Sequence, residues 1–268
     1  MKVIIVGGVA GGMSAATRLR RLMEDAEIII FEKGPFVSFA NCGLPYYVSG
    51  EIANRDSLLV QTPESLKARF NLDVRPFHEV ISISPAEHTV TVRHDGQEFT
   101  EGYDKLILSP GAKPFVPAID GLAEANNVYT LRNVPDLDEI MAALDKHPKE
   151  AVVIGAGFIG LEMAENLAKR GLQVTIVEKA PHVLPPLDQE MAAFVQAELL
   201  ANGVRVITSQ SAIQFEEQGK VIVLENGQKI ASDLTILSVG VEPENGLAKA
   251  AGIELGLRGG ILVDEHYE

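Results

Sequence analysis

The sequence predicts an α/β fold in which two copies of one plan follow each other along the chain. Each copy begins with an apolar run, a glycine-rich turn and a helix-like pattern, and continues to a second apolar run that ends in an acid. The closing segments 104–114 and 233–243 align without gaps and share Asp, Ile, Leu, Ser, Gly and Pro at the same places. Repetition of strand, turn and helix predicts a parallel sheet in each copy.

The first copy opens with residues 3–6, a continuous β-branched run that is typical of a buried parallel strand. The glycine turn 7–12 follows, and then a helix is expected over about 11–23. In the dinucleotide-binding pattern Gly-x-Gly-x-x-Gly, Val9 occupies the place of the middle glycine. Glu32 ends the next apolar run, where an acid can accept hydrogen bonds from ribose hydroxyls, and amides at the helix N-terminus can hold phosphates.

The second copy matches the pattern fully. The turn Gly155-Ala-Gly-Phe-Ile-Gly160 follows the apolar run 152–154 and precedes a helix expected to reach about Lys169. Glu178 ends the next apolar run. A carboxylate there pairs with a free 2′-hydroxyl and repels a 2′-phosphate, which favours NADH over NADPH. The neighbouring Lys179 weakens that inference.

Other local signals complete the plan. The hairpin turns Asp95-Gly96 and Asn226-Gly227 predict a small antiparallel meander in each copy. Further helices are expected over about 137–144 and 188–202, and a strand is expected in the last segment, 259–268.

The copies differ in one inserted segment. Glu32 and Asp104 are 72 positions apart, whereas Glu178 and Asp233 are 55 apart, so the first copy carries 17 extra residues. Cys42, the only cysteine, lies in that extra segment. A shared scaffold with one added segment indicates that the added segment carries the chemistry. The alternative is an ordinary loop insertion around a buried thiol, since free cysteines are usually core residues.

The residues around the cysteine favour a redox role. Pro45 predicts the first turn of a helix, which places the Cys42 sulfur at a helix N-terminus, where a thiolate is stabilised and the pKa of a thiol falls. No second cysteine is present, so exchange between two thiols of the chain is excluded. A redox cycle would pass through a sulfenic acid, or through a mixed disulfide or persulfide with a small molecule.

The composition excludes several classes of protein. The length of 268 residues suggests about two domains. A net charge of -14 without a basic tract argues against nucleic acid and anionic membranes. No apolar run approaches membrane-spanning length, and one cysteine fits a reducing compartment, so a cytoplasmic protein is expected. No histidine has metal-ligand spacing, so no metal site is expected. The basic run Arg18, Arg20 and Arg21 is interpreted as a solvated helix face, with an anion site for a phosphorylated substrate as the alternative.

Two dinucleotide-binding copies with a cysteine inserted in the first resemble the FAD- and NAD(P)-dependent pyridine nucleotide-disulfide oxidoreductases, over all 268 residues. The segment Ser38-Phe-Ala-Asn-Cys-Gly-Leu-Pro-Tyr-Tyr47 and the turn 7–12 resemble the single-cysteine branch, the coenzyme A-disulfide reductases and NADH-dependent persulfide or polysulfide reductases. NADH oxidases and peroxidases of this superfamily generally have a histidine where this chain has Ala10, which counts against peroxide or oxygen as the oxidant. The resemblance implies a glutathione-reductase-like fold of two Rossmann-like domains, each with a parallel sheet and a small antiparallel β-meander.

The resemblance also implies domains and site residues. Residues 1–112 would form an FAD-binding domain to which 244–268 return incompletely, and 113–243 an NAD-binding domain. Relatives continue into a dimerisation domain, so the chain resembles the N-terminal portion of a longer homodimeric enzyme and is expected to be inactive alone. Cys42 would be the redox nucleophile. The residues implied to line FAD are Gly7, Gly8, Val9, Ala10, Gly11, Glu32, Lys33, Cys42, Val80, Ser109, Pro110, Gly111, Ala112 and Arg132. Those implied to line NAD are Gly155, Ala156, Gly157, Phe158, Ile159, Gly160, Glu178 and Gly240. Those implied to contact coenzyme A are Ser14, Arg18, Arg21, Ser38 and Asn41.

The expected function is an FAD-dependent oxidoreductase in which electrons from NADH reduce a mixed disulfide or persulfide on Cys42 and release a thiol or sulfide. NADPH is the less expected donor, and coenzyme A is expected as a substrate or bound ligand. Coenzyme A disulfide, a persulfide and a polysulfide stay open as substrates. Two alternative functions also stay open: an NADH oxidase or peroxidase that cycles through Cys42 sulfenic acid, and a nucleotide-binding module without activity.

Overall fold

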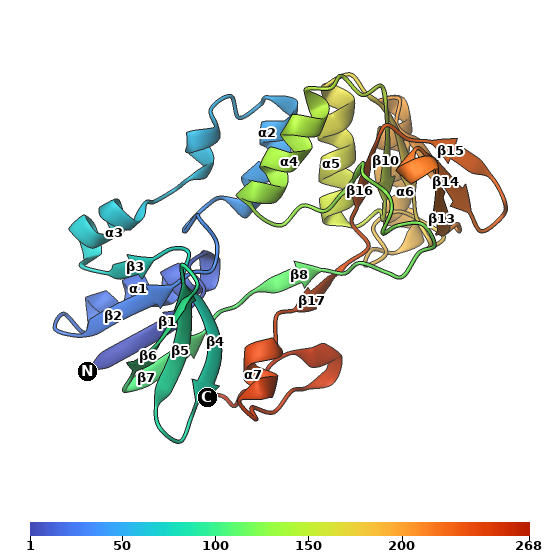
Figure 1. Cartoon of the computed structure of the whole chain (residues 1–268). Coiled ribbons are helices and arrows are strands. Elements are labelled where there is room, and N and C mark those ends of the chain that lie inside the picture. The colour runs from blue at the N-terminus through green and yellow to red at the C-terminus, as the bar shows by residue number, and fades with distance from the viewer. The chain divides into compact units, whose positions relative to one another are not determined.

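The computed structural model describes all 268 residues, and the chain divides into two compact units (Figure 1). The first unit contains 1–40, 56–113 and 242–268, and the second contains 41–55 and 114–241. None of the helices combines the length and apolar character that crossing a membrane would require.

The first unit is built on a parallel sheet of four strands in the order β3-β2-β1-β7. Its strands are β1 (Lys2–Val6), β2 (Glu27–Phe31), β3 (Asp73–Arg75) and β7 (Lys105–Leu108). Helices α1 (Ala10–Leu22) and α3 (Pro63–Phe70) belong to this unit, and so does an antiparallel meander of β4 (Glu79–Ser84), β5 (Thr89–His94) and β6 (Gln97–Gly102).

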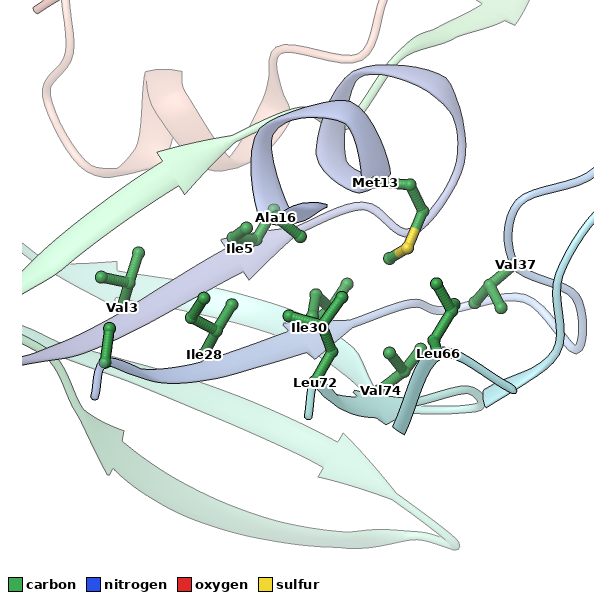
Figure 2. Close-up of a cluster of buried hydrophobic side chains, with 11 residues drawn as sticks. Val3, Ile5, Met13, Ala16, Ile28, Ile30, Val37, Leu66, Leu72 and Val74 are labelled. Carbon is green, nitrogen blue, oxygen red and sulfur yellow. The ribbon is translucent and has the colours of Figure 1, made fainter. Parts of the chain in front are cut away.

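Both faces of this sheet are buried, which explains why its central strands are apolar without alternation. Val3 and Ile5 of β1 point to one face, where Met13 and Ala16 of α1 and further aliphatic side chains cover them (Figure 2). Ile4 points to the other face and packs in a second cluster with the meander. Successive side chains of a strand alternate between faces, so a strand covered on both sides must be apolar at every position.

The second unit repeats this arrangement. Its sheet has the order β12-β11-β10-β16-β9, so the four strands equivalent to β3-β2-β1-β7 appear in the same order, with one more strand at the edge. The strands are β10 (Glu150–Ile154), β11 (Gln173–Val177), β12 (Arg205–Ile207), β16 (Leu234–Leu237) and β9 (Val128–Tyr129). The unit's meander consists of β13 (Ala212–Glu216), β14 (Val221–Leu224) and β15 (Lys229–Ala231). The predicted duplication of an α/β plan is confirmed.

The helices of the second unit are α2 (Leu44–Ser49), α4 (Val134–Leu144), α5 (Phe158–Lys169) and α6 (Gln189–Ala201). Where the chain passes between the units, β8 (Ala112–Pro114) pairs with β17 (Val241–Pro243). Helix α7 (Gly246–Ala250) follows in the first unit.

Both hairpin turns are confirmed, and the strand expected in the last segment is wrong. Asp95 and Gly96 both have positive φ, as a two-residue type I′ turn requires. Asn226 and Gly227 lie in the loop between β14 and β15, where only Gly227 has positive φ. The last segment instead forms one isolated bridge, between Leu255 and Ile261, followed by a turn. The carboxylate of Asp264 accepts hydrogen bonds from the backbone amides of residues 266 and 268, and such local bonds compete with strand pairing.

Candidate functional site

The glycine turns of the two units have the same geometry. Gly7 has φ of 103° and Gly155 has φ of 101°, a region that L side chains rarely adopt. A Cβ at Gly7 would lie 2.0 Å from the carbonyl oxygen of Ser109, and one at Gly155 would lie 2.4 Å from that of Ser238. Both turns therefore pack directly against the segment that follows the neighbouring central strand, and only glycine fits there.

The last glycine of each turn allows the helix to approach its strand. A Cβ at Gly12 would lie 1.8 Å from the carbonyl oxygen of Gly7, and the matching contact of Gly160 with Gly155 would measure 2.0 Å. The middle glycine of the second turn is different, because nothing lies within 4 Å of a Cβ at Gly157. The fold thus leaves that side open, and the same position in the first turn accommodates the side chain of Val9.

The acid of the first unit holds the glycine turn. Oε2 of Glu32 accepts a hydrogen bond of 2.7 Å from the backbone amide of Gly8, and Oε1 accepts one of 2.7 Å from the amide of Gly34. An ionised carboxylate offers about four lone-pair sites, so about two remain for ribose hydroxyls. The sequence predicted the ligand role of this acid but not its bonds to the turn.

Glu178 makes the same pair of bonds in the second unit. Oε2 accepts a hydrogen bond of 2.6 Å from the amide of Ala156, and Oε1 accepts one of 2.7 Å from the amide of Ala180. The residue is only 8% exposed. The buried carboxylate is therefore oriented by the backbone before any nucleotide binds.

The helices that follow the glycine turns differ from the other long helices at their N-termini. Neither α1 nor α5 has a side-chain cap. Thr62, Asn133 and Asp188 cap α3, α4 and α6. The first amides of a helix have no partner within it and favour anions. The glycine turns, the oriented acids and the uncapped helices thus fit the phosphates and riboses of two dinucleotides.

The inserted segment presents the cysteine to solvent. Cys42 is exposed and lies in a 3-10 turn (Asn41–Gly43) directly before α2, whose first turn contains Pro45 as predicted. The alternative of a thiol buried in the core is wrong. The segment Asn41–Arg55 belongs to the second unit, whereas the sequence placed it in the first domain, because α2 packs against α5 and α4.

The residues implied for FAD are divided between the units. The first unit contains those of the glycine turn, with Glu32, Lys33, Val80 and 109–112, and the second contains Cys42 and Arg132. Lys33 pairs with Glu244 at 3.1 Å within the first unit. The NAD residues lie together in the second unit, where Gly240 has φ of 127°.

Three of the residues implied for coenzyme A share one face of α1. Ser14, Arg18 and Arg21 follow the i, i+4, i+7 spacing and are exposed. Arg20 has a structural role that the sequence did not reveal, since its guanidinium donates to the carbonyl oxygens of Phe70, the last residue of α3, and of Asn71, which follows it. Of the other two, Ser38 has φ of 47° in the first unit, and Asn41 lies beside Cys42 in the second.

Two carboxyl groups of the second unit have shifted pKa values. Burial, and then the charge of Glu165, raise the pKa of Glu162 on α5. Backbone hydrogen bonds from Glu150 and Lys149 lower the pKa of Asp233. No group of three or more His, Cys, Asp and Glu side chains is arranged to hold a metal ion.

Comparisons with known proteins identify one family. The sequence profile of the family described as pyridine nucleotide-disulphide oxidoreductase matches residues 1–268. A coenzyme A disulfide reductase of Staphylococcus haemolyticus is 36% identical over 270 residues, which cover 100% of this chain and 60% of that protein. An NADH oxidase of Methanocaldococcus jannaschii is 36% identical over 260 residues, which cover 96% of this chain and 58% of that protein.

Two solved structures are similar throughout the chain. Reduced CoADR-RHD of Bacillus anthracis is 51% identical with a TM-score of 0.98, and the match covers 100% of this chain and 48% of that one. A NAD-dependent persulfide reductase from A. fulgidus is 37% identical with a TM-score of 0.96, and the match covers 99% of this chain and 51% of that one. The chain spans about 60% of the length of the curated relatives.

Proposed function

Because the chain belongs to the pyridine nucleotide-disulphide oxidoreductase family, we propose that the full-length protein is a flavin-dependent enzyme that uses NADH to reduce a sulfur–sulfur bond through Cys42. The single observation that carries this proposal is the exposed, lone Cys42 at the start of α2, in a chain with two dinucleotide-type glycine turns. A buried thiol would support a structural role instead.

Each unit would bind one nucleotide with its own residues. The first unit would hold FAD through its glycine turn, Glu32 and the amides of α1, and the second would hold NADH through its own turn, Glu178 and α5. We assign FAD to a domain of 1–112 with 244–268 and NADH to a domain of 113–243, except that the segment 41–55 lies in the second unit. FAD, when bound, supplies the electron pair that NADH delivers as hydride and that resolves the sulfur adduct on Cys42.

The step at the cysteine balances without a second protein thiol. The Cys42 thiolate attacks a disulfide R–S–S–R′, the bond between the two substrate sulfurs breaks, and R′–S⁻ leaves with a mixed disulfide on Cys42. The electron pair then converts that mixed disulfide into the Cys42 thiolate and R–S⁻. With a persulfide or polysulfide, the species released is hydrosulfide or a shorter chain.

Coenzyme A disulfide, or a coenzyme A persulfide, is the proposed substrate. A coenzyme A disulfide reductase and a persulfide reductase are among the similar proteins. Arg18 and Arg21, both exposed on α1, have the charge that coenzyme A phosphates require, with Ser14, Ser38 and Asn41 as the other proposed contacts. A homodimer in the reducing cytoplasm is proposed for the full-length enzyme.

The reaction products distinguish the proposed function from the alternative of an NADH oxidase. The full-length enzyme is assayed with NADH and coenzyme A disulfide, a persulfide, or oxygen alone, and thiol, sulfide, peroxide and NADH are measured. Rapid release of coenzyme A or sulfide supports the proposal. NADH consumption that depends only on oxygen would favour an NADH oxidase, the activity by which the M. jannaschii relative is named. Mass spectrometry of Cys42 as isolated gives independent evidence: a coenzyme A adduct supports the first function and a sulfenic acid the second.

A further inference from the structure

The segment Asn41–Arg55, which carries Cys42, is flanked by residues 38–40 and 58–60 of the first unit, and these two stretches are paired with each other. The amide of Ala40 donates to the carbonyl oxygen of Leu58 at 2.8 Å, and the amide of Val60 donates to that of Ser38 at 3.0 Å. Phe39 and Leu59 form an antiparallel bridge between these bonds. This pairing fixes where the segment begins and ends, but the residues in between must be held in place by other contacts.

Helix α2 cannot supply this support alone. It has only six residues, and isolated helices of that length do not form in water. Leu44 and Val48 are 2% and 0% exposed, so apolar packing holds one face of the helix within the second unit. Such packing fixes the distance of the helix from its neighbours more strongly than its position along them, because apolar contact is not directional.

Directional contacts come from the end of α5. Nη1 of Arg170 donates to the carbonyl oxygen of Val48 at 2.9 Å, and the last carbonyls of a helix have no partner within it. Lys169 pairs with Glu51 just beyond α2 and with Glu165 at 2.8 Å on its own helix. These carboxylates, Glu165 first, raise the pKa of Lys169 above its usual value, because both favour the charged ammonium.

A second directional contact comes from α4. Nε of Arg55 donates to Oδ1 of Asp138 at 2.7 Å, and Nη2 donates to Oδ2 at 2.6 Å. The side chains are 30% and 44% exposed. A two-bond pair of this kind fixes orientation as well as distance, which a single lysine contact does not. At the other end of the segment, Nδ2 of Asn41 reaches the carbonyl oxygen of Arg132 only at 3.5 Å.

We propose that Arg170 and the pair Arg55–Asp138 are positioning residues for Cys42. The inference rests on the proposed function, in which Cys42 is the reacting group. None of the three is assigned a contact with the thiol. Arg170 holds the C-terminal end of α2, and the pair Arg55–Asp138 holds the end of the segment that follows it. Because α2 is short and begins directly after the turn that contains Cys42, fixing its C-terminal end also fixes that turn. Loss of either contact lets the segment shift, so the thiolate meets the sulfur substrate in the correct geometry less often.

The full-length enzyme carrying Arg55→Ala or Arg170→Ala tests this inference, with Arg93→Ala as the matched control. Arg93 makes a comparable exposed pair with Glu98 at 3.0 Å, but in the meander of the first unit. We expect hydrogen exchange of the α2 amides to rise at least about tenfold in both test variants. We expect kcat for disulfide reduction to fall about tenfold with KM for NADH unchanged, and the rate of Cys42 alkylation by iodoacetamide at fixed pH to change severalfold. The control should match the unmodified enzyme in all three.

Rescue distinguishes positioning from general loss of stability. The double variant Arg55→Asp with Asp138→Arg, which swaps the two charges, should restore normal hydrogen exchange of α2 and normal kcat. Arg55→Lys keeps the charge but not the two-bond geometry, so its hydrogen exchange and kcat should lie between those of Arg55→Ala and the unmodified enzyme. Hydrogen exchange of α2 and a Cys42 alkylation rate that are unchanged in both alanine variants would overturn the inference. It would also be overturned if the double variant Arg55→Asp with Asp138→Arg had the normal thermal midpoint but lost as much kcat as Arg55→Ala. Alkylation and exchange need neither flavin nor disulfide, so they report on these residues even if the enzyme proves to reduce no sulfur substrate.

Discussion

Each of the two acids, Glu32 and Glu178, has a second task that its place in the motif does not reveal. Each carboxylate binds one amide of its own glycine turn and the amide two residues beyond itself. A sequence pattern places an acid at the end of a strand, but the bonds of that acid depend on how the turn folds over it. Substituting either acid therefore alters the turn as well as the ribose contact.

Glu178 leads to a prediction about the nicotinamide cofactor. The full-length enzyme should use NADH with a kcat/KM about 100-fold higher than NADPH, because the buried carboxylate accepts from a 2′-hydroxyl and repels a 2′-phosphate. Glu178→Gln should reduce the ratio sharply, whereas Glu32→Gln, the matched change in the other unit, should leave it unchanged. Equal use of both cofactors by the unmodified enzyme would refute the assignment.

Asp233 leads to a prediction about pH. Its carboxylate accepts from the amides of Lys149 and Glu150 at 2.8 and 3.0 Å, and these bonds lower its pKa below the usual 3.8. A lowered pKa in the folded state means that the stabilisation is present above the unfolded value and is lost as the pH falls through the folded one. Asp233→Asn should therefore cost about 1 kcal/mol at neutral pH, and this cost should shrink as the pH falls through the folded-state pKa of Asp233.

Urea unfolding at several pH values measures that difference. Asp25→Asn, which changes an exposed aspartate after α1, is the control and should behave like the unmodified chain. A deficit in Asp233→Asn that persists undiminished in acid would show that the amide bonds to the carboxylate are not its cause.

At the scale of elements, alanine substitutions of two glycines in the second glycine turn should have very different effects on stability. Gly160→Ala would place a Cβ 2.0 Å from a backbone oxygen and should destabilise the second unit by about 3 kcal/mol. Gly157→Ala meets nothing within 4 Å and should change stability by less than about 0.5 kcal/mol. Thermal unfolding of both variants gives the comparison, and equal loss of stability would show that the two glycines are not distinguished by space.

Elements defined by local signals could be predicted from the sequence, and those defined by distant contacts could not. Apolar runs, glycine turns and hairpin residues act within a few positions, and they predicted both sheets and both meanders. The attachment of α2 depends on Arg55 meeting Asp138, which is 83 positions away, and Arg170 meeting Val48, which is 122 positions away. No local pattern marks such pairs, so the membership of the cysteine segment in the second unit was not foreseen.

At the scale of the whole molecule, equal topology raises the question of which unit binds which nucleotide. We expect the second unit to bind NADH, so Gly157→Asp should abolish NADH binding to the full-length enzyme and leave its FAD content unchanged. Gly157 precedes the uncapped first turn of α5, where a carboxylate would occupy the free amides and repel the pyrophosphate. Calorimetry with NADH and the flavin absorbance of the purified variant give the two results. Loss of FAD with intact NADH binding would reverse the assignment.

The central claim is that Cys42 performs the sulfur chemistry while the two nucleotide units deliver electrons to it. Stopped-flow absorbance of the full-length Cys42→Ser variant tests it most directly, because flavin reduction by NADH and thiol release from the disulfide are followed separately. A serine hydroxyl cannot replace a thiolate in attack on sulfur, but hydride transfer needs only the nucleotides. We predict flavin reduction within about threefold of the unmodified enzyme and thiol release lowered at least about 1,000-fold. Disulfide reduction by the serine variant at near the normal rate would contradict the account and leave Cys42 with a structural role.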